Sequence, residues 1–514
     1  MNNETEDKRS GSRGGLYSTE ERIVTVRGEC SQDYVLPDYM GDVKKVLKYS
    51  ATIIPCNKFS SENEVSAMGI VTFRVLYLDA DDLLTEASFS ADYEHTECMR
   101  SDFSDASVDM KVQSVSIRLG GPRKISAKAS VALDFGAVVE KEIPSLSDTD
   151  NCEIKKRSLK IHTAAYLKAD EREYAEEIYR LEDTASDEVE IIKQEARAFI
   201  DAVYPTDSGV NLSGFAEAFC ILRVNDEVMR LEKKIPIEEA IACEKTSPDV
   251  RYFPSAFVIG STVNINNAAD SDSDTFAVSV VMSMNVECGV TMRYNEEYSV
   301  VADAFMIGCP SDAEYCDFKY PELICALVDK AKLSYTYKRE EEPIRTLYDW
   351  DAQVKNVSCK IDGADAEVTA DLSITLVAGG DNADECCSKK TDEEIKLKYK
   401  LPAPCDNAKI SLSVTPCEVS PSFDGEKIYV ECCLSVKLFA EEEKSVRIIR
   451  SLKPCLSEAE RKREIVVYCA EKGDTVWTVA KKYAIPTSSV IKGNPSLADC
   501  EEIKPGTKVI MVTA

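Results

Sequence analysis

The sequence predicts a mainly β protein with three tandem β-rich domains, followed by a small βααβ domain. Two observations support this fold class. Short runs of β-branched and aromatic residues alternate with polar ones between turn residues, as expected of half-buried strands. The same order of runs returns along the chain after roughly 145–160 residues, which indicates tandem domains and not a solenoid of short repeats. The last fifty residues change to helical spacing.

The first domain contains two predicted hairpins. Residues 71–78 form a β-branched and aromatic run, the acidic turn 79–82 follows, and a second run covers 83–89. Further along, residues 108–119 and 124–135 alternate apolar and polar side chains on either side of a Gly-Gly-Pro turn. Alternation of this kind buries one face of each strand.

The same pattern recurs twice. The second set pairs residues 215–224 with 228–235 and residues 257–265 with 276–286; the third pairs 368–377 with 395–401 and 410–419 with 428–439. Residues 188–202 match the strand that precedes the first hairpin, although an amphipathic helix is the alternative there. The predicted divisions are a tail at 1–22, β-rich domains at 23–150, 151–320 and 321–455, a charged linker at 456–464 and the βααβ domain at 465–514.

The charge balance excludes several function classes. The chain of 514 residues carries 62 Lys and Arg against 91 Asp and Glu, a net charge of −29. Such a chain repels phosphate and anionic lipid, so we expect no nucleic-acid partner. The N-terminal residues have no apolar signal-peptide core, and no long apolar run predicts a membrane span. We therefore expect the protein to stay in the compartment that makes it, without direct membrane insertion.

Cysteine and histidine usage narrows the chemistry. There are 20 Cys and only 2 His, and no CxxC pair. We interpret most cysteines as small buried residues kept reduced, with an oxidised cross-linked state or a metal site as alternatives. No Walker loop, HExxH or GxSxG motif occurs, and the acidic run 270–274 lacks the fixed Gly and Glu of an EF-hand loop. We expect no enzyme activity, no cofactor and no metal site.

The C-terminal segment predicts the order β-α-α-β. A short strand at 465–468 precedes a Gly-Asp-Thr turn that can cap a helix at 476–483. A second helix at 488–492 ends at a Gly-Asn-Pro stop, and a Pro-Gly turn leads into the closing strand.

This segment resembles the LysM domain. The resemblance rests on Tyr468, the Gly-Asp-Thr turn at 473–475, Val476-Trp477, Ala480, Tyr483, Asn494-Pro495 and the Ile-Lys-Pro-Gly run at 503–506. LysM domains generally bind glycans that contain N-acetylglucosamine, such as peptidoglycan, in a groove between two loops. The resemblance implies groove residues at Gly473, Asp474, Thr475, Val476, Asn494, Pro495 and Ser496. Trp477 and Tyr483 are equally compatible with a purely structural role in the core.

The order of domains, with a Gln-Asp-Tyr-Val-Leu-Pro run at 32–37, resembles the SPOCS-domain proteins of clostridial spore formers. That resemblance implies a spore-coat scaffold in the mother-cell cytoplasm and at the outer surface of the forespore. It also implies a partner, the coat ATPase of the stage IV sporulation protein A type, held through the LysM domain. The alternative is a peptidoglycan-binding protein anchored to the spore cortex or the cell wall.

Overall fold

The computed structural model describes residues 15–61, 64–98, 105–146, 151–225, 227–243, 249–267, 277–338, 344–379, 386–424, 427–455 and 464–513. Nearly all of these residues lie in long antiparallel strands, and the only α-helices in these ranges are near the C-terminal end. The prediction of a mainly β chain is therefore confirmed. The acidic run 270–274 and most of the predicted linker 456–464 lie outside the described residues.

The strands form three consecutive units, each with two antiparallel sheets. Unit 1 contains the sheets β1-β6-β5 and β2-β3-β4. Its strands are β1 (Leu16–Val35), β2 (Val43–Ser61), β3 (Glu64–Asp79), β4 (Leu84–Cys98), β5 (Asp105–Gly121) and β6 (Lys124–Glu142). The core lies between the two sheets, where side chains of β3 such as Phe73 pack with side chains of β6 such as Phe135.

Unit 2 repeats this order with one additional strand. Its sheets are β12-β13-β7, with β8 also pairing with β13, and β11-β10-β9. Its strands are β7 (Cys152–Lys168), β8 (Arg172–Glu182), β9 (Val189–Thr206), β10 (Gly209–Val224), β11 (Glu227–Ala242), β12 (Arg251–Asn267) and β13 (Ala277–Met306). A short 3-10 turn, Ser186–Glu188, precedes β9.

Unit 3 has the sheets β14-β19-β18 and β15-β16-β17. Its strands are β14 (Ser311–Lys338), β15 (Thr346–Asp362), β16 (Asp365–Gly379), β17 (Cys387–Lys400), β18 (Lys409–Asp424) and β19 (Lys427–Pro454). In all three units the first strand pairs with the last, so each unit begins and ends in the same sheet.

The predicted hairpins are all present. Leu78 pairs with Leu84 across the first turn, and the other predicted pairs of runs form β5-β6, β10-β11, β12-β13, β16-β17 and β18-β19. Residues 189–206 form strand β9 and not the alternative helix. Two predicted boundaries differ from the strands. β1 begins at Leu16, inside the predicted tail, because Tyr17 and Thr19 are buried against other strands. β14 begins at Ser311, so the predicted boundary at 320 lies within a continuous strand.

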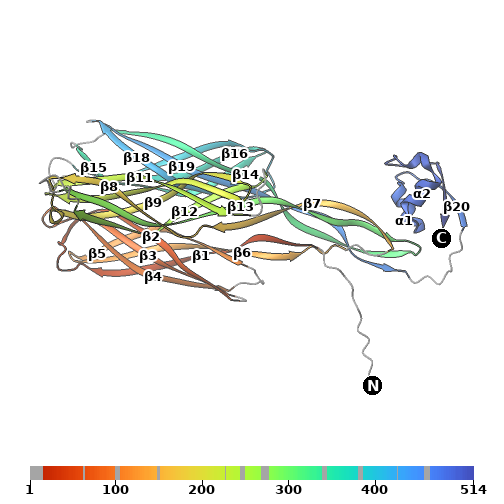
Figure 1. Cartoon of the computed structure of the whole chain (residues 1–514), viewed down its shortest axis with the longest axis horizontal. Coiled ribbons are helices and arrows are strands. Elements are labelled where there is room, and N and C mark those ends of the chain that lie inside the picture. Colours follow the sequence, from red (N-terminus) through yellow and green to blue (C-terminus); the bar gives the residue numbers. More distant parts are fainter. Residues whose placement is uncertain are drawn as a thin grey trace, which may run out of the picture.

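The paired ends of the longest strands, which belong to units 2 and 3, extend from the broad body of the molecule as a narrow stem (Figure 1). β13 has 30 residues, and β14 and β19 have 28 each. The stem has its own apolar core, to which unit 1 contributes Tyr17 and Ile143. Units 2 and 3 contribute Leu159, Ile161, Val300, Phe318, Val446 and Ile448 to the same core. The three units therefore share one hydrophobic core at the base of the stem.

Within the body, the units meet at a buried set of charges. Lys48 of β2, Lys193 of β9 and Asp349 of β15 come from units 1, 2 and 3. One carboxylate oxygen of Asp349 lies 2.9 Å from Lys48 Nζ and 2.7 Å from Lys193 Nζ. Glu86 of β4 and Glu195 of β9 also face Lys193. We call these five residues the inter-unit charge cluster.

The cluster sets unusual protonation preferences. Burial alone would raise the pKa of Asp349, but Lys193 and Lys48 outweigh it and lower the pKa to about 2. For Glu86, burial dominates over the attraction of Lys193 and Arg74 and raises the pKa to about 7. Burial and then the positive charge of Lys193 lower the pKa of Lys48.

The raised pKa of Glu86 predicts a stability loss with rising pH. Between the ordinary value of 4.5 and about 7, the folded state binds more protons than the unfolded state, so stability falls as pH rises. The full difference corresponds to about 3 kcal/mol. Glu86→Gln should therefore be about as stable as the wild type at pH 5, and more stable at pH 8 by an amount approaching that value. Urea unfolding at both pH values measures it.

The matched control is Glu94→Gln, which changes an exposed residue of the same strand. This variant should follow the wild type at both pH values. Identical pH dependence in Glu86→Gln and the wild type would contradict the assignment of a buried, titrating Glu86.

Candidate functional site

The C-terminal residues form a separate small domain. It consists of β20 (Glu464–Cys469), α1 (Val476–Tyr483), α2 (Thr487–Gly493), a 3-10 turn (Pro495–Leu497) and β21 (Lys508–Thr513). β20 and β21 pair antiparallel, and the helices pack on the core of this domain. Its most buried residues are Val479, Ala480, Val490, Ile503, Val509 and Met511. The predicted βααβ order is confirmed.

The first predicted lip of the groove, residues 473–476, is fixed by its own hydrogen bonds. Gly473 has φ +89°, a conformation that favours glycine, and its N–H donates to Glu502 Oε1 at 2.8 Å. The Asp474 carboxylate accepts from the Glu471 N–H and the Tyr468 hydroxyl, at 2.8 and 2.7 Å. Both bonds lower the pKa of Asp474, and the bond from the Glu471 N–H has the larger effect.

Residues Thr475 and Val476 start the first helix. The Thr475 hydroxyl accepts from the Thr478 N–H at 3.1 Å and so caps α1. Val476 is partly buried and packs against the domain core. The side chains of this lip therefore shape the loop, and most of its backbone groups are also bonded inside the domain.

The second predicted lip, residues 494–496, is fastened to β21 by Asn494. Its Nδ2 donates to the carbonyls of Val490 and Ile510, at 2.9 and 2.8 Å. Its Oδ1 accepts from the Ile510 N–H at 2.9 Å. The side-chain amide is thus used inside the domain, whereas Pro495 and Ser496 are exposed.

The structure places the two lips in one domain but anchors them separately. The first is tied to the segment before β21, where the Ile503 N–H donates to the Asp474 carbonyl at 2.7 Å. The second is tied to Ile510. In the described part of the chain, no hydrogen bond joins residues 473–476 to 494–496. The role of these seven residues in ligand binding stays a prediction.

Sequence reasoning missed an exposed apolar surface on this domain. Ile465 and Val467 of β20 are 75% and 58% exposed, and Ile510 and Val512 of β21 are 48% and 59% exposed. In the strand register Ile465 lies opposite Val512, and Val467 lies opposite Ile510. We call these four residues the sheet face. The sequence does contain a sign of this surface, because both strands have apolar residues at consecutive positions. A two-stranded sheet that helices cover on one side needs apolar residues on that side only.

The domain is docked on the tip of the stem through Asp303 of β13. Asp303 accepts from the indole N–H of Trp477 at 2.6 Å and from the Tyr315 hydroxyl at 2.9 Å, and it pairs with Lys481. The Trp477 ring also packs edge-on against Phe305 at 5.1 Å between centroids. Burial raises the pKa of Asp303, but the bonds from Lys481 and Trp477 outweigh it and lower that pKa.

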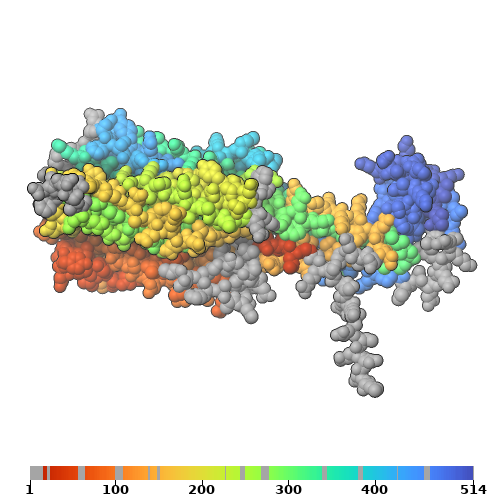
Figure 2. Space-filling view, in the orientation of Figure 1, coloured from red at the N-terminus to blue at the C-terminus, as the bar shows by residue number. Residues whose placement is uncertain are grey.

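Backbone contacts add to this dock. The Thr487 N–H donates to Glu153 Oε1 and the Gly308 N–H donates to the Ala484 carbonyl, each at 2.8 Å. The domain consequently stands at one end of the long axis, separated from the broad body by the stem (Figure 2). Trp477, a candidate core residue from its sequence, joins the C-terminal domain to the stem.

One comparison with known proteins identifies the domain. Residues 470–511 match the model of the LysM domain. The chain therefore carries a LysM domain at its C-terminal end, and this match does not extend to the three β units. No curated protein and no solved structure matches the chain. Among the described helices, none is long and apolar enough to cross a membrane.

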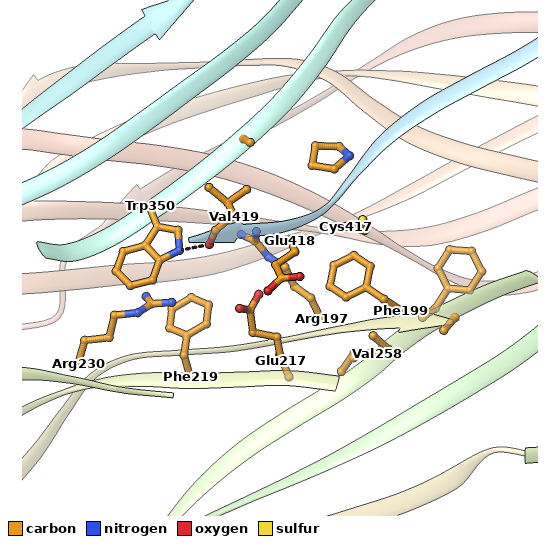
Figure 3. Close-up of a pocket in the computed structure, with 16 residues that line it drawn as sticks. Arg197, Phe199, Glu217, Phe219, Arg230, Val258, Trp350, Cys417, Glu418 and Val419 are labelled. Atoms are coloured by element: carbon orange, nitrogen blue, oxygen red, sulfur yellow. Dashed lines mark hydrogen bonds between the residues drawn. The ribbon is translucent and has the colours of Figure 1, made fainter. Parts of the chain in front are cut away.

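Apart from the LysM domain, the described residues contain a cavity of about 280 Å³ between units 2 and 3 (Figure 3). The Arg230 guanidinium fills one side, between the rings of Phe219 and Trp350 at 3.8 and 3.6 Å. Glu418 on the opposite wall pairs with Lys234. Since these charged and aromatic groups already contact one another across the boundary, we interpret the cavity as part of the packing between the units.

Each histidine lies beside a carboxylate. His162 of β7 is buried, with Nδ1 3.0 Å from the Glu441 carboxylate of β19, and so joins units 2 and 3. His95 of β4 lies 3.3 Å from Glu97 on the same strand. In the described ranges, no three His, Cys, Asp or Glu side chains gather as a metal site.

The bonds of Asn494 predict a structural effect of its removal. Asn494→Ala deletes all three and should lower the free energy of unfolding of the LysM domain by about 1–2 kcal/mol. Hydrogen exchange of residues 464–513 in the full chain measures this local stability. Ser496→Ala, at an exposed neighbouring position, should leave exchange unchanged. Unchanged exchange in Asn494→Ala would contradict the structural role.

The Asp303 contacts predict how the dock can be released. Asp303→Asn removes the charge that holds Lys481, so Trp477 should become more exposed and its fluorescence emission should shift to longer wavelength. Small-angle scattering should show a larger maximum dimension. Because the pKa of Asp303 is lowered, its contribution is present above the ordinary carboxyl range and is lost as pH falls through the lowered pKa.

The control for this dock is Glu314→Gln, which changes an exposed residue of β14 beside Tyr315. It should leave both signals as in the wild type. If Asp303→Asn also leaves both signals unchanged, Asp303 does not hold the domain.

Proposed function

We propose that this chain is a non-enzymatic scaffold that presents a LysM recognition module on a stem, and that the module binds a protein partner. The observation that carries the proposal is the sheet face. Four large aliphatic side chains lie in two cross-strand pairs on one side of β20 and β21, about half or more exposed. Contiguous exposed apolar groups on a small soluble domain are typical of interaction surfaces.

Charge distribution supports a protein partner at this end. From Ile465 onward the chain has six lysines against five carboxylates, a net charge of +1. Since the whole chain has a net charge of −29, residues 1–464 have a net charge of −30. A partner that approaches the LysM domain therefore meets little repulsion from the domain itself. The polar side-chain atoms of Asp474 and Asn494 are already bonded inside the domain, which leaves the apolar face as its most available surface.

For the identity of the partner we rely on the sequence resemblance alone. The order of β domains and LysM resembles the SPOCS-domain proteins, and we propose the coat ATPase of the stage IV sporulation protein A type as the partner. The expected location is then the mother-cell cytoplasm and the outer forespore surface, where the scaffold would tether the basement layer of the coat.

A second candidate function is glycan recognition, which the LysM match at 470–511 favours. In this case residues 473–476 and 494–496 would contact N-acetylglucosamine units of peptidoglycan. The two functions use different surfaces of the domain, so substitutions can separate them.

The protein-binding proposal predicts a strong effect of the sheet face. The double variant Val467→Ser and Ile510→Ser removes one cross-strand apolar pair without touching the buried side of the sheet. We expect at least tenfold weaker capture of the purified coat ATPase by the full chain, because apolar contacts at an interface centre dominate its affinity. Surface plasmon resonance measures it.

The matched control is Tyr204→Ser, which removes an aromatic residue that is 58% exposed on unit 2. This variant should bind as the wild type does. If the wild type does not bind the ATPase but sediments with purified peptidoglycan, glycan recognition replaces protein binding as the proposed function. Peptidoglycan binding that the double variant retains and Ser496→Arg abolishes would locate that site at the predicted lips.

A further inference from the structure

Two cysteines of unit 3 lie in direct contact. Cys325 is on β14, and Cys405 is in the segment 401–408 that leads from β17 to β18. Their sulfur atoms are 3.7 Å apart, and the residues are 5% and 3% exposed. The surrounding groups are apolar and include Ala366, Leu401, Leu438 and Ala440. The two thiols thus face each other in a buried, apolar environment.

The segment that carries Cys405 is held in place by backbone bonds. The Leu401 N–H donates to the Ala364 carbonyl at 2.7 Å, and the Cys405 N–H donates to the Gly363 carbonyl at 2.9 Å. In return the Gly363 N–H donates to Asp406 Oδ1 at 2.7 Å. The segment is therefore fixed against the turn between β15 and β16, so the contact between the thiols is a defined feature of the fold.

We propose that Cys325 and Cys405 are a modification site, at which a peroxide oxidises the two thiols to an intramolecular disulfide. The Cys405 sulfur attacks one peroxide oxygen, the O–O bond breaks, and Cys405 becomes a sulfenic acid while its thiol proton leaves with the departing oxygen as the first water. The Cys325 sulfur then attacks the Cys405 sulfur, the S–O bond breaks, and the second water leaves with the remaining proton. In total, two thiols and one hydrogen peroxide give one disulfide and two waters.

Position in the fold assigns the order of these steps, and burial assigns their pace. Cys405 lies in the segment between β17 and β18, which must open to admit the oxidant, so we place the first step at Cys405. Burial first, and then the neighbouring Cys405, raise the pKa of Cys325 to about 12, which slows reaction at Cys325 near neutral pH. The same burial protects the disulfide from reductants once it has formed, so the modified state is formed slowly and is long-lived.

The cross-link would join the two sheets of unit 3. Cys325 belongs to the sheet β14-β19-β18, whereas Cys405 follows directly on the sheet β15-β16-β17. The two cysteines are 80 residues apart in sequence. A covalent bond that closes a loop of this length restricts the unfolded chain strongly and stabilises the folded unit.

The experiment uses the full chain, reduced and then treated with hydrogen peroxide. Free thiols are alkylated, the protein is digested without reductant, and linked peptides are identified by mass spectrometry. We expect a pair of peptides linked through Cys325 and Cys405. Its mass should be two hydrogens below the sum of the two reduced peptides, and dithiothreitol should separate the pair. The oxidised wild type should also unfold at a temperature several degrees above its reduced form.

Three variants complete the test. Cys405→Ala and Cys325→Ala should each lose the linked peptide and the thermal shift, and either serves if the other fails to fold. Cys359→Ala removes a partly buried thiol that packs against the same cluster and should retain both signals. The proposal is overturned if Cys325 and Cys405 stay reduced while the exposed Cys98 and Cys469 are oxidised, or if Cys325 pairs with Cys359.

Discussion

The arrangement of the whole body depends on one buried carboxylate, that of Asp349, which two lysines from the other two units share. Asp349 is fully buried, and Lys48 and Lys193 are nearly so. Removing Asp349 or either lysine leaves an uncompensated buried charge and costs about 3–5 kcal/mol, although the intact set adds little net stability over apolar packing. We infer that its main effect is specificity. The apolar residues that also meet between the units, such as Leu47, Ile221 and Val377, would tolerate many docking angles, whereas the charge cluster requires all three units in one geometry.

The pairing of first and last strands carries this geometry to the LysM domain. Because each unit starts and ends in the same sheet, the extended ends of its strands leave the body side by side. Unit 2 supplies Asp303 at the end of β13, and unit 3 supplies Tyr315 near the start of β14. Both contact Lys481 of the LysM domain. The position of the LysM domain is consequently coupled to the packing of units 2 and 3.

Local patterns predicted the mainly β fold, the hairpins and the LysM domain, since each depends on residues close in sequence. Strand alternation with turn residues, or a helix cap such as Thr475, can be identified within ten residues. Features that depend on distant partners were not predictable. Leu16 to Arg22 reads as a charged tail, and becomes a strand only by pairing with residues 136–142. Lys48 and Asp349 are 301 residues apart, and nothing near either residue indicates the other.

The LysM motif has the same limitation. Its recognisable residues are those that determine the fold: Gly473 adopts a positive φ, Asp474 closes the loop, and Asn494 ties α2 to β21. Residues that select a ligand need not belong to the motif. The four residues of the sheet face are not among the motif residues. Electrostatic repulsion between exposed charges is largely screened beyond about 8 Å in physiological salt. The stem separates the LysM domain from the body (Figure 2), so the acidic residues of the body contribute little to the electrostatic potential at the far side of the LysM domain.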